Sequence, residues 1–365
     1  MNKLSECKIV LIGDTLGEGG AERVQARLSI LFDSKGINVH HVIVRNVIKY
    51  DYAGTLFNMG LLKSEINTFG NRIFRLYELN KYLAKHQFDY IIDFRVKNNF
   101  FQEFILANII YKLPYVMSIR SFDTNYYFPK NKFLAKLIYK KALGIITVSK
   151  ALERKIKREY GYKNVTTIYN PIEKKDDILH LDLDYQFIFG MGRMKTNIKQ
   201  FDHLIKAYKK SDSRNHNIKL LLAGDGDNKK ELELLVEKEG LTEDVEFLGH
   251  LENPEAYLKR AYFTALTSKN EWFPNVLLES LVYSTPVVAY ECESGPNEII
   301  MDTHNGLLVK NQDIDAFAIA INKMITDKDL YVNCKLNAKS SVDKFNPEAI
   351  VNKWIKFLKI EQKSL

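Results

Sequence analysis

The chain has 365 residues, of which 46% are hydrophobic and 27% are charged. This length exceeds what one ordinary core needs and suits two domains of roughly 150–200 residues each. With only 18 glycines and 8 prolines, the composition excludes a disordered or collagen-like chain. The formal net charge of +8 attracts polyanions such as nucleic acid, anionic lipid or phosphorylated substrates, without selecting among them.

Cysteine usage and the length of the apolar runs exclude further classes. Cys7, Cys292 and Cys334 are scattered, without the spacing of a zinc site or a disulfide framework, which fits a reducing cytoplasm. The first residues hold only a short apolar run, and no segment reaches the roughly 18 uninterrupted apolar residues of a membrane span. We therefore expect a soluble or peripheral protein without a signal peptide.

Short apolar runs alternate with longer amphipathic ones along the first half of the chain. The segment 19–32 has helical spacing, with Val24, Leu28 and Leu31 on one face. Predicted strands cover residues 8–12, 39–44, 90–94, 115–119 and 145–148. This β-α-β rhythm is typical of a parallel sheet with helices on both faces.

The same rhythm restarts after Asn170-Pro171. A helix is predicted from Gly192 to about Lys210, and another ends near Glu239. Predicted strands cover residues 187–191, 219–223, 245–248, 263–266 and 286–289. The acidic segment 172–184 lacks periodicity, as linkers do. We therefore predict an α/β protein with two doubly wound domains, residues 1–171 and 172–346.

The end of the chain predicts one more helix. Asn346-Pro347 is typical of a helix cap followed by proline at the first helical position. One apolar stripe follows, formed by Ala349, Ile350, Trp354, Ile355 and Leu358. We expect this helix to cover residues 347–361 and to pack back onto the first domain.

The first candidate loop contains Gly19 and Gly20. In open α/β sheets, ligands bind outside the carboxyl ends of the strands, and glycines there let backbone amides approach a phosphate. A tight strand-to-helix turn is the alternative. A dinucleotide site would need glycine where Glu22 stands, and an acid after the second strand, where the chain reads Val44-Arg45-Asn46. NAD is therefore disfavoured.

Two basic residues follow the first strand of the second domain. Arg193 and Lys199 come after Gly192, in a loop that runs into a helix. A guanidinium binds phosphate oxygens as a fork and an ammonium binds them as a point charge, which suits a diphosphate leaving group. A solvated basic turn is the alternative.

The loop after the predicted strand 219–223 reads Gly224-Asp225-Gly226-Asp227. Its D-x-D pattern holds a divalent metal in some sugar-nucleotide enzymes. The same pattern also occurs at 182–184 and 313–315, so it carries little weight. The glycines favour a turn that passes close to a nucleotide, and we expect no metal here.

The most informative segment covers residues 268–280. Glu271 lies in a loop after a predicted strand, Pro274 suits the start of a helix, and Glu279 follows inside that helix. The helix dipole and free amides suit an anion, and the two carboxylates can accept hydrogen bonds from sugar or ribose hydroxyls. A capped helix with two surface acids is the alternative.

In this order, the motifs resemble glycosyltransferase family 4, whose members are retaining enzymes with the GT-B fold: two facing Rossmann-like domains with a cleft between them. The resemblance spans nearly the whole chain. It includes Gly-Gly-Ala-Glu-Arg (19–23), Ile-Tyr-Asn-Pro-Ile (168–172), Gly-Asp-Gly (224–226), the E-x(7)-E pair Glu271 and Glu279, and Ser-Gly-Pro-Asn-Glu-Ile (294–299).

The resemblance implies a role for each matching residue. Arg193 and Lys199 would bind the donor diphosphate and act in catalysis with Glu271, which contacts the donor sugar hydroxyls. Glu279 would contact the ribose. The remaining implied donor-binding positions are Gly19, Gly20, Gly192, Gly224, Phe273, Pro274, Asn275 and Val276.

The chain departs from the family pattern at two places. The arginine and the lysine are usually five residues apart, but Arg193 and Lys199 are six apart, so Lys195 is an alternative to Lys199. Many members also carry a histidine after a strand of the first domain, where this chain reads Ser-Ile-Arg-Ser-Phe (118–122). Arg120 is then expected to face the donor or the acceptor.

The resemblance implies a retaining hexosyl- or N-acetylhexosaminyltransferase that uses a UDP-sugar and needs no metal or other cofactor. The 19–23 and 294–299 motifs resemble those of bacterial members that build lipid-linked oligosaccharides or surface polysaccharides such as lipopolysaccharide or capsule. The expected partners are a nucleotide sugar and a lipid-linked or polysaccharide acceptor, and not nucleic acid. A two-domain UDP-sugar epimerase and a non-catalytic nucleotide-sugar binder are the alternatives.

A basic segment extends these expectations to the membrane. In residues 129–143, an apolar stripe is surrounded by Lys132, Lys136, Lys140 and Lys141, and the helix predicted next adds more basic residues. Each lysine or arginine near an anionic leaflet contributes about 1 kcal/mol. We therefore expect a protein that is peripheral on the cytoplasmic face of the inner membrane, attached through its N-terminal domain. Two surface helices that only pack on the sheet are the alternative.

Overall fold

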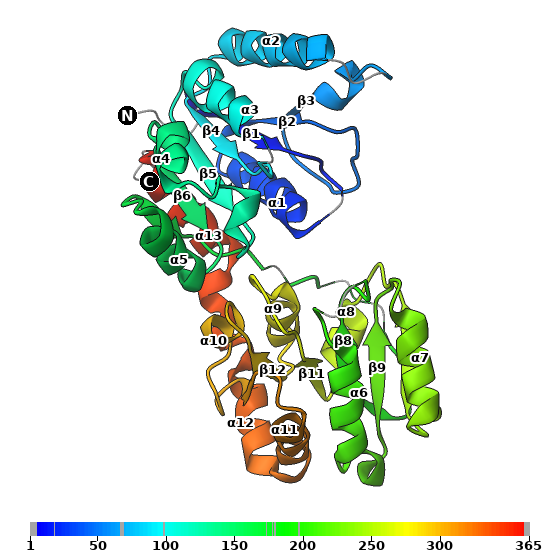
Figure 1. The fold of residues 1–365 in the computed structure, drawn as a ribbon. Helices are drawn as coiled ribbons and strands as arrows, with labels where there is room; N and C mark the ends of the chain where they lie inside the picture. Colours follow the sequence, from blue (N-terminus) through cyan, green and yellow to red (C-terminus); the bar gives the residue numbers. More distant parts are fainter. Residues whose placement is uncertain are drawn as a thin grey trace. The chain divides into compact units, whose positions relative to one another are not determined.

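The computed structural model describes residues 6–17, 19–65, 69–97, 99–172, 174–176, 178, 180–195 and 198–360. The chain divides into two compact units. The first unit comprises Met1–Pro171 with Pro347–Leu365, and the second comprises Ile172–Asn346. Each unit is built around its own parallel sheet (Figure 1).

The first unit has strands in the order β3-β2-β1-β4-β5-β6-β7. They are β1 (Lys8–Gly13), β2 (Asn38–Ile43), β3 (Thr55–Asn58), β4 (Tyr90–Asp93), β5 (Tyr115–Ile119), β6 (Gly144–Thr147) and β7 (Val165–Thr167). The central strands are almost entirely buried, because helices cover a doubly wound sheet and its strands must be apolar throughout.

The helices of the first unit connect these strands. They are α1 (Gly20–Ser34), α2 (Phe69–His86), α3 (Phe100–Ile105), α4 (Lys132–Tyr139), α5 (Lys150–Tyr160) and α13 (Pro347–Leu358). Shorter turns are η2 (Met59–Leu62), η3 (Leu106–Ile110, a π-helical turn that continues α3) and η4 (Thr124–Tyr126). Ser149 caps α5 through its side chain, and Gly161 ends that helix in the left-handed conformation.

The second unit has strands in the order β10-β9-β8-β11-β12-β13. They are β8 (Gln186–Met191), β9 (Ile218–Ala223), β10 (Val245–Gly249), β11 (Phe263–Leu266), β12 (Val287–Glu291) and β13 (Gly306–Lys310). The helices are α6 (Phe201–Lys210), α7 (Lys229–Lys238), α8 (Glu255–Arg260), α9 (Asn275–Leu281), α10 (Pro296–Ile299), α11 (Ile314–Thr326) and α12 (Lys328–Ala338). Two short turns complete it, η5 (Ser213–His216) and η6 (Ser340–Phe345).

The helix at the end of the chain, α13, belongs to the first unit. Its indole Trp354 is fully buried and meets the Phe32 ring of α1 edge-on, with centroids 6.3 Å apart. Lys35 and Glu348 form an ion pair at the same junction. Burial of this stripe therefore joins the two ends of the chain within one core.

The two parallel α/β sheets confirm the predicted fold class. The predicted strands of both units are present, with boundaries shifted by one or two residues. The prediction was wrong in placing a helix directly after Gly192, since α6 begins only at Phe201. It also missed β3, β7 and β13, which are short or lie at the edge of a sheet. No helix in the described part of the chain combines the length and apolar character that a membrane crossing needs.

Candidate active site

The candidate donor site lies at the carboxyl edge of the second sheet. Because every strand pair there is parallel, the loops after β9, β8, β11 and β12 emerge at the same edge. The chain order reverses between β8 and β11, which are hydrogen-bonded neighbours. In open α/β sheets, ligands bind at this reversal.

Backbone contacts stack the loops after β8 and β9 directly on each other. The amide of Gly192 donates to Ala223 O at 3.0 Å, and that of Met194 donates to Asp225 O at 2.9 Å. Gly224 has φ +136°, and a Cβ on it would lie 1.9 Å from Gly192 O. Only glycine fits both this conformation and this approach. The two glycines are therefore needed to form the edge of the site.

Lys199 and Glu271 meet at the reversal point. Lys199 Nζ lies 2.5 Å from Glu271 Oε1, and Ser268 Oγ donates to the same oxygen at 2.6 Å. The lysine stem packs over Gly192, where a Cβ would lie 3.0 Å from Lys199 Cε. The backbone holds both loops, since Lys269 N donates to Ile198 O at 2.8 Å. The structure thus brings together a cation and a carboxylate that are distant in sequence.

Arg193 lies on the same loop, directly after Gly192. Its side chain is exposed, and no ion pair joins it to the described residues. Lys195 is also exposed, while the side chain of Lys199 is only 23% exposed because it packs in the site. Thr196 and Asn197, which belong to the same motif, lie outside the described residues.

The segment before α9 forms the other wall. Pro274 caps α9, and Phe273 and Val276 are buried, with Asn275 between them partly exposed. Gly295, with φ +102°, lies against this turn, since a Cβ there would be 2.5 Å from Pro274 Cδ. Ser294 Oγ donates to Trp272 O at 3.0 Å. The 294–299 motif therefore supports the turn that follows Glu271.

Glu279 is half-buried in α9, about one turn after the start of that helix at Asn275. The helix ends at Leu281, and Ser284, with φ +64°, lies between it and β12. The carboxylate of Glu279 therefore belongs to the helix that Pro274 begins.

Cys292 is a site neighbour that the sequence did not single out. Its thiol is buried after β12, and burial, followed by the negative charge of Glu271, raises its pKa to about 12. The thiol is therefore protonated at neutral pH and is no nucleophile. Ser268 and Thr267 were missed too, because serine and threonine after a strand carry no distinctive spacing.

In the first unit, the predicted glycines open α1. The backbone of Gly19 caps the helix, and the Glu22 carboxylate folds over it, with Oε2 2.6 Å from where a Cβ would lie. A Cβ on Gly20 would meet nothing within 4 Å. The protein itself therefore does not require glycine at position 20. Glu18, between Gly17 and Gly19, lies outside the described residues.

Arg120 is a buried cation at the carboxyl end of β5. Its Nε donates to Ser118 Oγ at 3.0 Å, its Nη1 donates to Asn170 Oδ1, and the guanidinium lies 5.1 Å from the Phe94 ring centroid. Among the described residues no carboxylate pairs with it, and burial lowers its pKa to about 10. A buried guanidinium without a counter-ion is suited to an anionic ligand.

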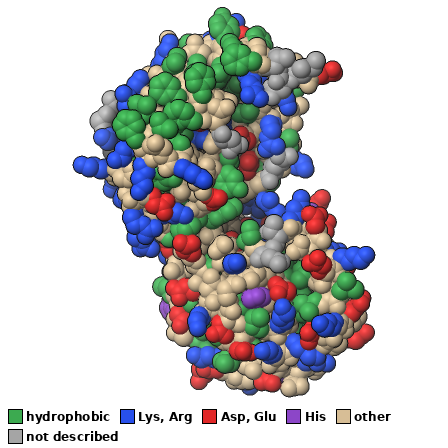
Figure 2. Space-filling view, in the orientation of Figure 1, with side chains coloured by type: hydrophobic (Ala, Val, Ile, Leu, Met, Phe, Trp, Pro, Cys, Tyr) green, Lys and Arg blue, Asp and Glu red, His purple; other side chains and the backbone are tan. Residues whose placement is uncertain are grey.

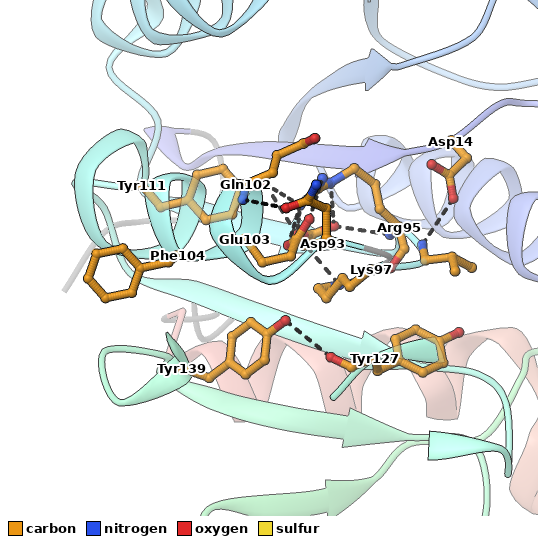
Figure 3. Close-up of polar contacts among 12 residues, drawn as sticks. Asp14, Asp93, Arg95, Lys97, Gln102, Glu103, Phe104, Tyr111, Tyr127 and Tyr139 are labelled. Carbon is orange, nitrogen blue, oxygen red and sulfur yellow. Dashed lines mark hydrogen bonds and ion pairs between the residues drawn. The ribbon is translucent and has the colours of Figure 1, made fainter. Parts of the chain in front are cut away.

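A buried charge network surrounds Arg95, which follows β4 (Figure 3). Arg95 binds the Asp93 carboxylate with Nη2–Oδ2 2.7 Å and the Glu103 carboxylate with Nη2–Oε2 3.2 Å. Tyr111 OH donates to Asp93 Oδ2 at 3.2 Å, and Lys97 Nζ lies 3.6 Å from the same oxygen. Two cations meet two carboxylates, so this network is neutral and unlike Arg120 it offers no net charge to a ligand.

The network fixes the loop after β4. Val96 N donates to Asp14 Oδ2 at 3.0 Å, and Lys97 N donates to Tyr126 O at 2.8 Å. The loops after β1, β4 and β5 are therefore tied together at the carboxyl edge of the first sheet (Figure 3). Burial disfavours the charged Asp93, but the attraction of Arg95 and Lys97 outweighs it and lowers the pKa of Asp93.

Comparison with known proteins identifies the family. Residues 171–341 match the family model described as glycosyl transferases group 1, and residues 18–175 match that of glycosyltransferase family 4. The chain is a glycosyltransferase whose residues 18–175 match family 4. The two matched regions cover both units of the structure, and the interpretation of the sequence as a glycosyltransferase is confirmed.

The relatives that match this glycosyltransferase over nearly their whole length include bacterial glycosyltransferases. The amylovoran biosynthesis glycosyltransferase AmsD of Erwinia amylovora is 24% identical, covering 95% of this chain and 97% of its own. An α-1,4-N-acetyl-D-galactosaminyltransferase of Campylobacter jejuni, named for a diphospho-undecaprenol-linked substrate, is 28% identical over 96% of this chain and 98% of its own. The epimerase and the non-catalytic binder are therefore not favoured.

Solved structures show the same GT-B fold. Anabaena Alr3699/HepE in complex with UDP has a TM-score of 0.77 at 18% identity, covering 96% of this chain and 99% of its own. A glycosyltransferase from Rickettsia africae reaches 0.80 at 15% identity, covering 98% of both chains. The structure of this glycosyltransferase thereby agrees with the GT-B architecture that the resemblance implied.

The cysteine thiols and the D-x-D pattern are the groups of this chain that could bear on metal binding. Cys7, Cys292 and Cys334 are free and buried. Asp225, the first acid of the D-x-D pattern, accepts a hydrogen bond from the amide of Gly226 at 2.8 Å. Within the described ranges, no three histidine, cysteine or acidic side chains gather into a potential metal site.

Proposed function

We propose that this glycosyltransferase moves a hexose or N-acetylhexosamine from a UDP-sugar to a hydroxyl of a lipid-linked or polysaccharide acceptor, with retention of anomeric configuration. The reaction would serve bacterial surface glycan synthesis, since one relative is named for amylovoran biosynthesis and another for a diphospho-undecaprenol-linked substrate. The observation that carries the proposal is the contact of Lys199 with Glu271 at the reversal point of the second sheet.

The second unit would bind the donor. Arg193 and Lys199 supply positive charge to the diphosphate, and Glu271 accepts hydrogen bonds from the sugar hydroxyls. The backbone of 273–276 would line the phosphates and the sugar, and Glu279 would hold the ribose. Gly192 and Gly224 would keep the loop surface low enough for the nucleotide to approach.

The reaction would depend on electrostatic stabilisation. As the bond between sugar and diphosphate breaks, negative charge develops on the leaving group, and fixed cations lower the barrier. The hydroxyl of the acceptor would attack from the face that the diphosphate leaves, which retains configuration without a protein nucleophile. The protonated, buried thiol of Cys292 is consistent with that route. A pair of carboxylates acting as acid and base, as in glycosidases, is not required.

We propose that no metal or other cofactor takes part, because Arg193 and Lys199 supply the charge that a divalent cation would otherwise supply. Turnover should then survive EDTA. Loss of activity in EDTA with recovery in Mn²⁺ would overturn this part of the proposal.

The first unit would bind the acceptor. Arg120, buried and without a carboxylate partner among the described residues, would contact an anionic group of either substrate. The open space at Gly20 would admit a ligand at the start of α1. We further propose that the protein works at the cytoplasmic face of the inner membrane, where a lipid-linked acceptor is available.

The identity of the donor can be tested directly. A panel of UDP-, GDP- and ADP-sugars is screened for protection against thermal unfolding, since a ligand that binds only the folded state raises the melting temperature. UDP-sugars should protect more than the others. The anomeric configuration of the product, read by NMR, then tests retention, and an inverted product would contradict the proposed mechanism.

A further inference from the structure

One face of the first unit exposes an unusual number of large apolar side chains. They come from η2, α2, α3, η3 and α4, and we call them the apolar face: Leu61, Phe69, Ile73, Phe74, Tyr77, Phe100, Phe101, Ile109 and Phe133. Figure 2 shows hydrophobic side chains gathered over α2 and α3. Single exposed apolar residues are common on protein surfaces, but contiguous clusters mark contact sites.

The helices that carry this face pack against one another. α2 contacts η2 and η3, while α3 and η3 both contact α4. Asn108 joins them through its side-chain amide, which donates to Phe104 O at 3.1 Å and to Ile138 O at 3.0 Å. The exposed residues therefore belong to one continuous layer of helices.

The pattern on α2 shows why these side chains are not part of the core. Phe69, Ile73 and Tyr77 are spaced by four residues and line one side of the helix, whereas Leu79 and Leu83 are the buried residues. The helix is thus apolar on two sides, of which only one is needed to cover the sheet. A helix that packs on a core by one face alone normally carries polar residues on the other.

Basic residues surround the apolar face. Arg72, Lys81 and Lys85 of α2, Lys112 after η3, and Lys130, Lys132, Lys136, Lys140 and Lys141 around α4 are all exposed. In residues 69–86, 99–112 and 130–141 the acids are Glu78, which is half-buried, and Glu103, which is buried against Arg95. The exposed charge of this layer is therefore almost entirely positive.

We infer that the apolar face is the surface by which this glycosyltransferase docks on an anionic lipid bilayer, with its aromatic residues entering the interface between headgroups and acyl chains. Apolar and aromatic side chains with basic neighbours are what such a surface requires. The inference rests on the proposed function, in which the acceptor can be lipid-linked, and it places the contact on α2, α3 and η3. The basic residues of α4 and α5 alone do not define it.

The structure favours this position over the basic residues of α4 and α5. Ile138 of α4 is buried, so this helix offers few apolar side chains beyond the exposed Phe133. On α5, Lys155 Nζ donates to Phe122 O at 2.8 Å, and Lys157 pairs with Glu153 at 2.6 Å. These bonds compete with lipid headgroups for the two lysines.

A second copy of this chain is the other possible occupant of an apolar face. Docking two copies through the same surface would bring two positive rims together, and like charges across an interface oppose association. An anionic leaflet has the opposite charge and therefore complements the basic residues around the apolar face. The bilayer is the occupant that charge favours.

Vesicle co-sedimentation tests the inference with a matched pair of variants. One replaces exposed residues of the apolar face, Ile73→Ser with Phe101→Ser. The control replaces Ile319→Ser with Leu336→Ser in the second unit, whose side chains are 68% and 76% exposed. The vesicles contain about 30% phosphatidylglycerol in phosphatidylcholine, since an anionic surface attracts basic residues.

The wild type and the control should bind these vesicles at low salt, and the apolar-face variant should bind about tenfold less. Equal binding by both variants, or none by the wild type, would overturn the inference. A wild type that is dimeric in gel filtration and ignores vesicles, with a monomeric apolar-face variant, would assign the surface to a second copy instead.

A spectroscopic readout separates insertion from electrostatic adsorption. When vesicles are added, the fluorescence emission of the Phe101→Trp variant should move to shorter wavelength, and brominated lipids should quench it. The emission of the Ile319→Trp variant should not change. Binding without quenching of the Phe101→Trp variant would show adsorption by charge alone and contradict insertion. None of these measurements uses donor or turnover, and UDP protection of the apolar-face variant reports separately on the proposed function.

Discussion

Lys199 and Glu271 form an ion pair of 2.5 Å across the point where the order of the second sheet reverses, although 72 residues separate them in the chain. Both residues follow neighbouring strands, β8 and β11, and their loops are joined by backbone hydrogen bonds. Both side chains are only partly accessible to solvent, so water screens the attraction between the two charges incompletely.

We predict that substitution of Lys199 and substitution of Glu271 have different effects on binding of UDP and of the UDP-sugar. Lys199→Met removes the cation that faces the diphosphate, and should weaken protection by UDP and lower turnover more than tenfold. Glu271→Gln keeps a hydrogen-bonding oxygen, so UDP protection should persist while the extra protection by the UDP-sugar falls. Thermal unfolding with UDP and with UDP-sugar measures both. Identical profiles for the two variants would show that they do not contact different parts of the donor.

Arg193→Ala and Glu279→Ala test two further residues assigned to the donor site. Each should lower turnover at least tenfold. Arg193→Ala removes the guanidinium that binds the diphosphate, and Glu279→Ala removes the carboxylate that binds the ribose. Neither should unfold the protein, since Arg193 is exposed and Glu279 is partly exposed. Circular dichroism checks the fold, and initial rates check activity. Wild-type rates in both variants would contradict the site assignment.

Gly224→Ala should be strongly destabilising. The residue has φ +136°, and a Cβ would lie 1.9 Å from Gly192 O, so the two loops must separate. We expect a loss of about 2 kcal/mol or more in the free energy of unfolding. Gly240→Ala is the control, since φ there is +65° and a Cβ would meet nothing within 4 Å. Its cost should be about 1 kcal/mol. Urea unfolding of both variants measures their free energies of unfolding, and equal losses would contradict the role of the contact between Gly224 and Gly192.

Sequence patterns revealed the fold because both kinds of element depend on local periodicity. The strands of each sheet centre are continuous apolar runs, such as that of β1, and the stripe of α13 follows helical spacing. The edge strands β3 and β7 escaped notice, since Thr55–Asn58 and Val165–Thr167 are short and partly exposed. The late start of α6, at Phe201, has another cause. The residue before it is held by a long-range hydrogen bond, from Thr267 Oγ1 to Gln200 O, which local periodicity does not reveal.

The site was less accessible to sequence reasoning than the fold. Glu271 and Lys199 could be named from a family motif, but their mutual contact depends on strand order, which no local pattern encodes. The network of Asp93, Arg95 and Glu103 was not predicted at all (Figure 3). Charged residues are read from sequence as surface residues, and only tertiary packing shows that these are buried together.

The last prediction concerns the buried histidine of the first sheet. His41 in β2 is fully buried, its Nδ1 faces Gln25 Nε2 at 3.2 Å, and its Nε2 faces Ala53 O at 3.2 Å. These partners suit a neutral ring that accepts at Nδ1 and donates at Nε2. Burial lowers the pKa of His41 from 6.5 to about 4.

Because the folded pKa is below the unfolded one, the unfolded chain binds the extra proton as pH falls. Stability from His41 is therefore complete above about pH 6.5 and decreases toward pH 4, by up to about 3 kcal/mol. His41→Gln cannot titrate, so the stability gap between wild type and this variant should narrow as pH falls from 7.5 to 5. Urea unfolding at the two pH values measures that gap. A gap that is the same at both would show that His41 titrates alike in the folded and unfolded chain.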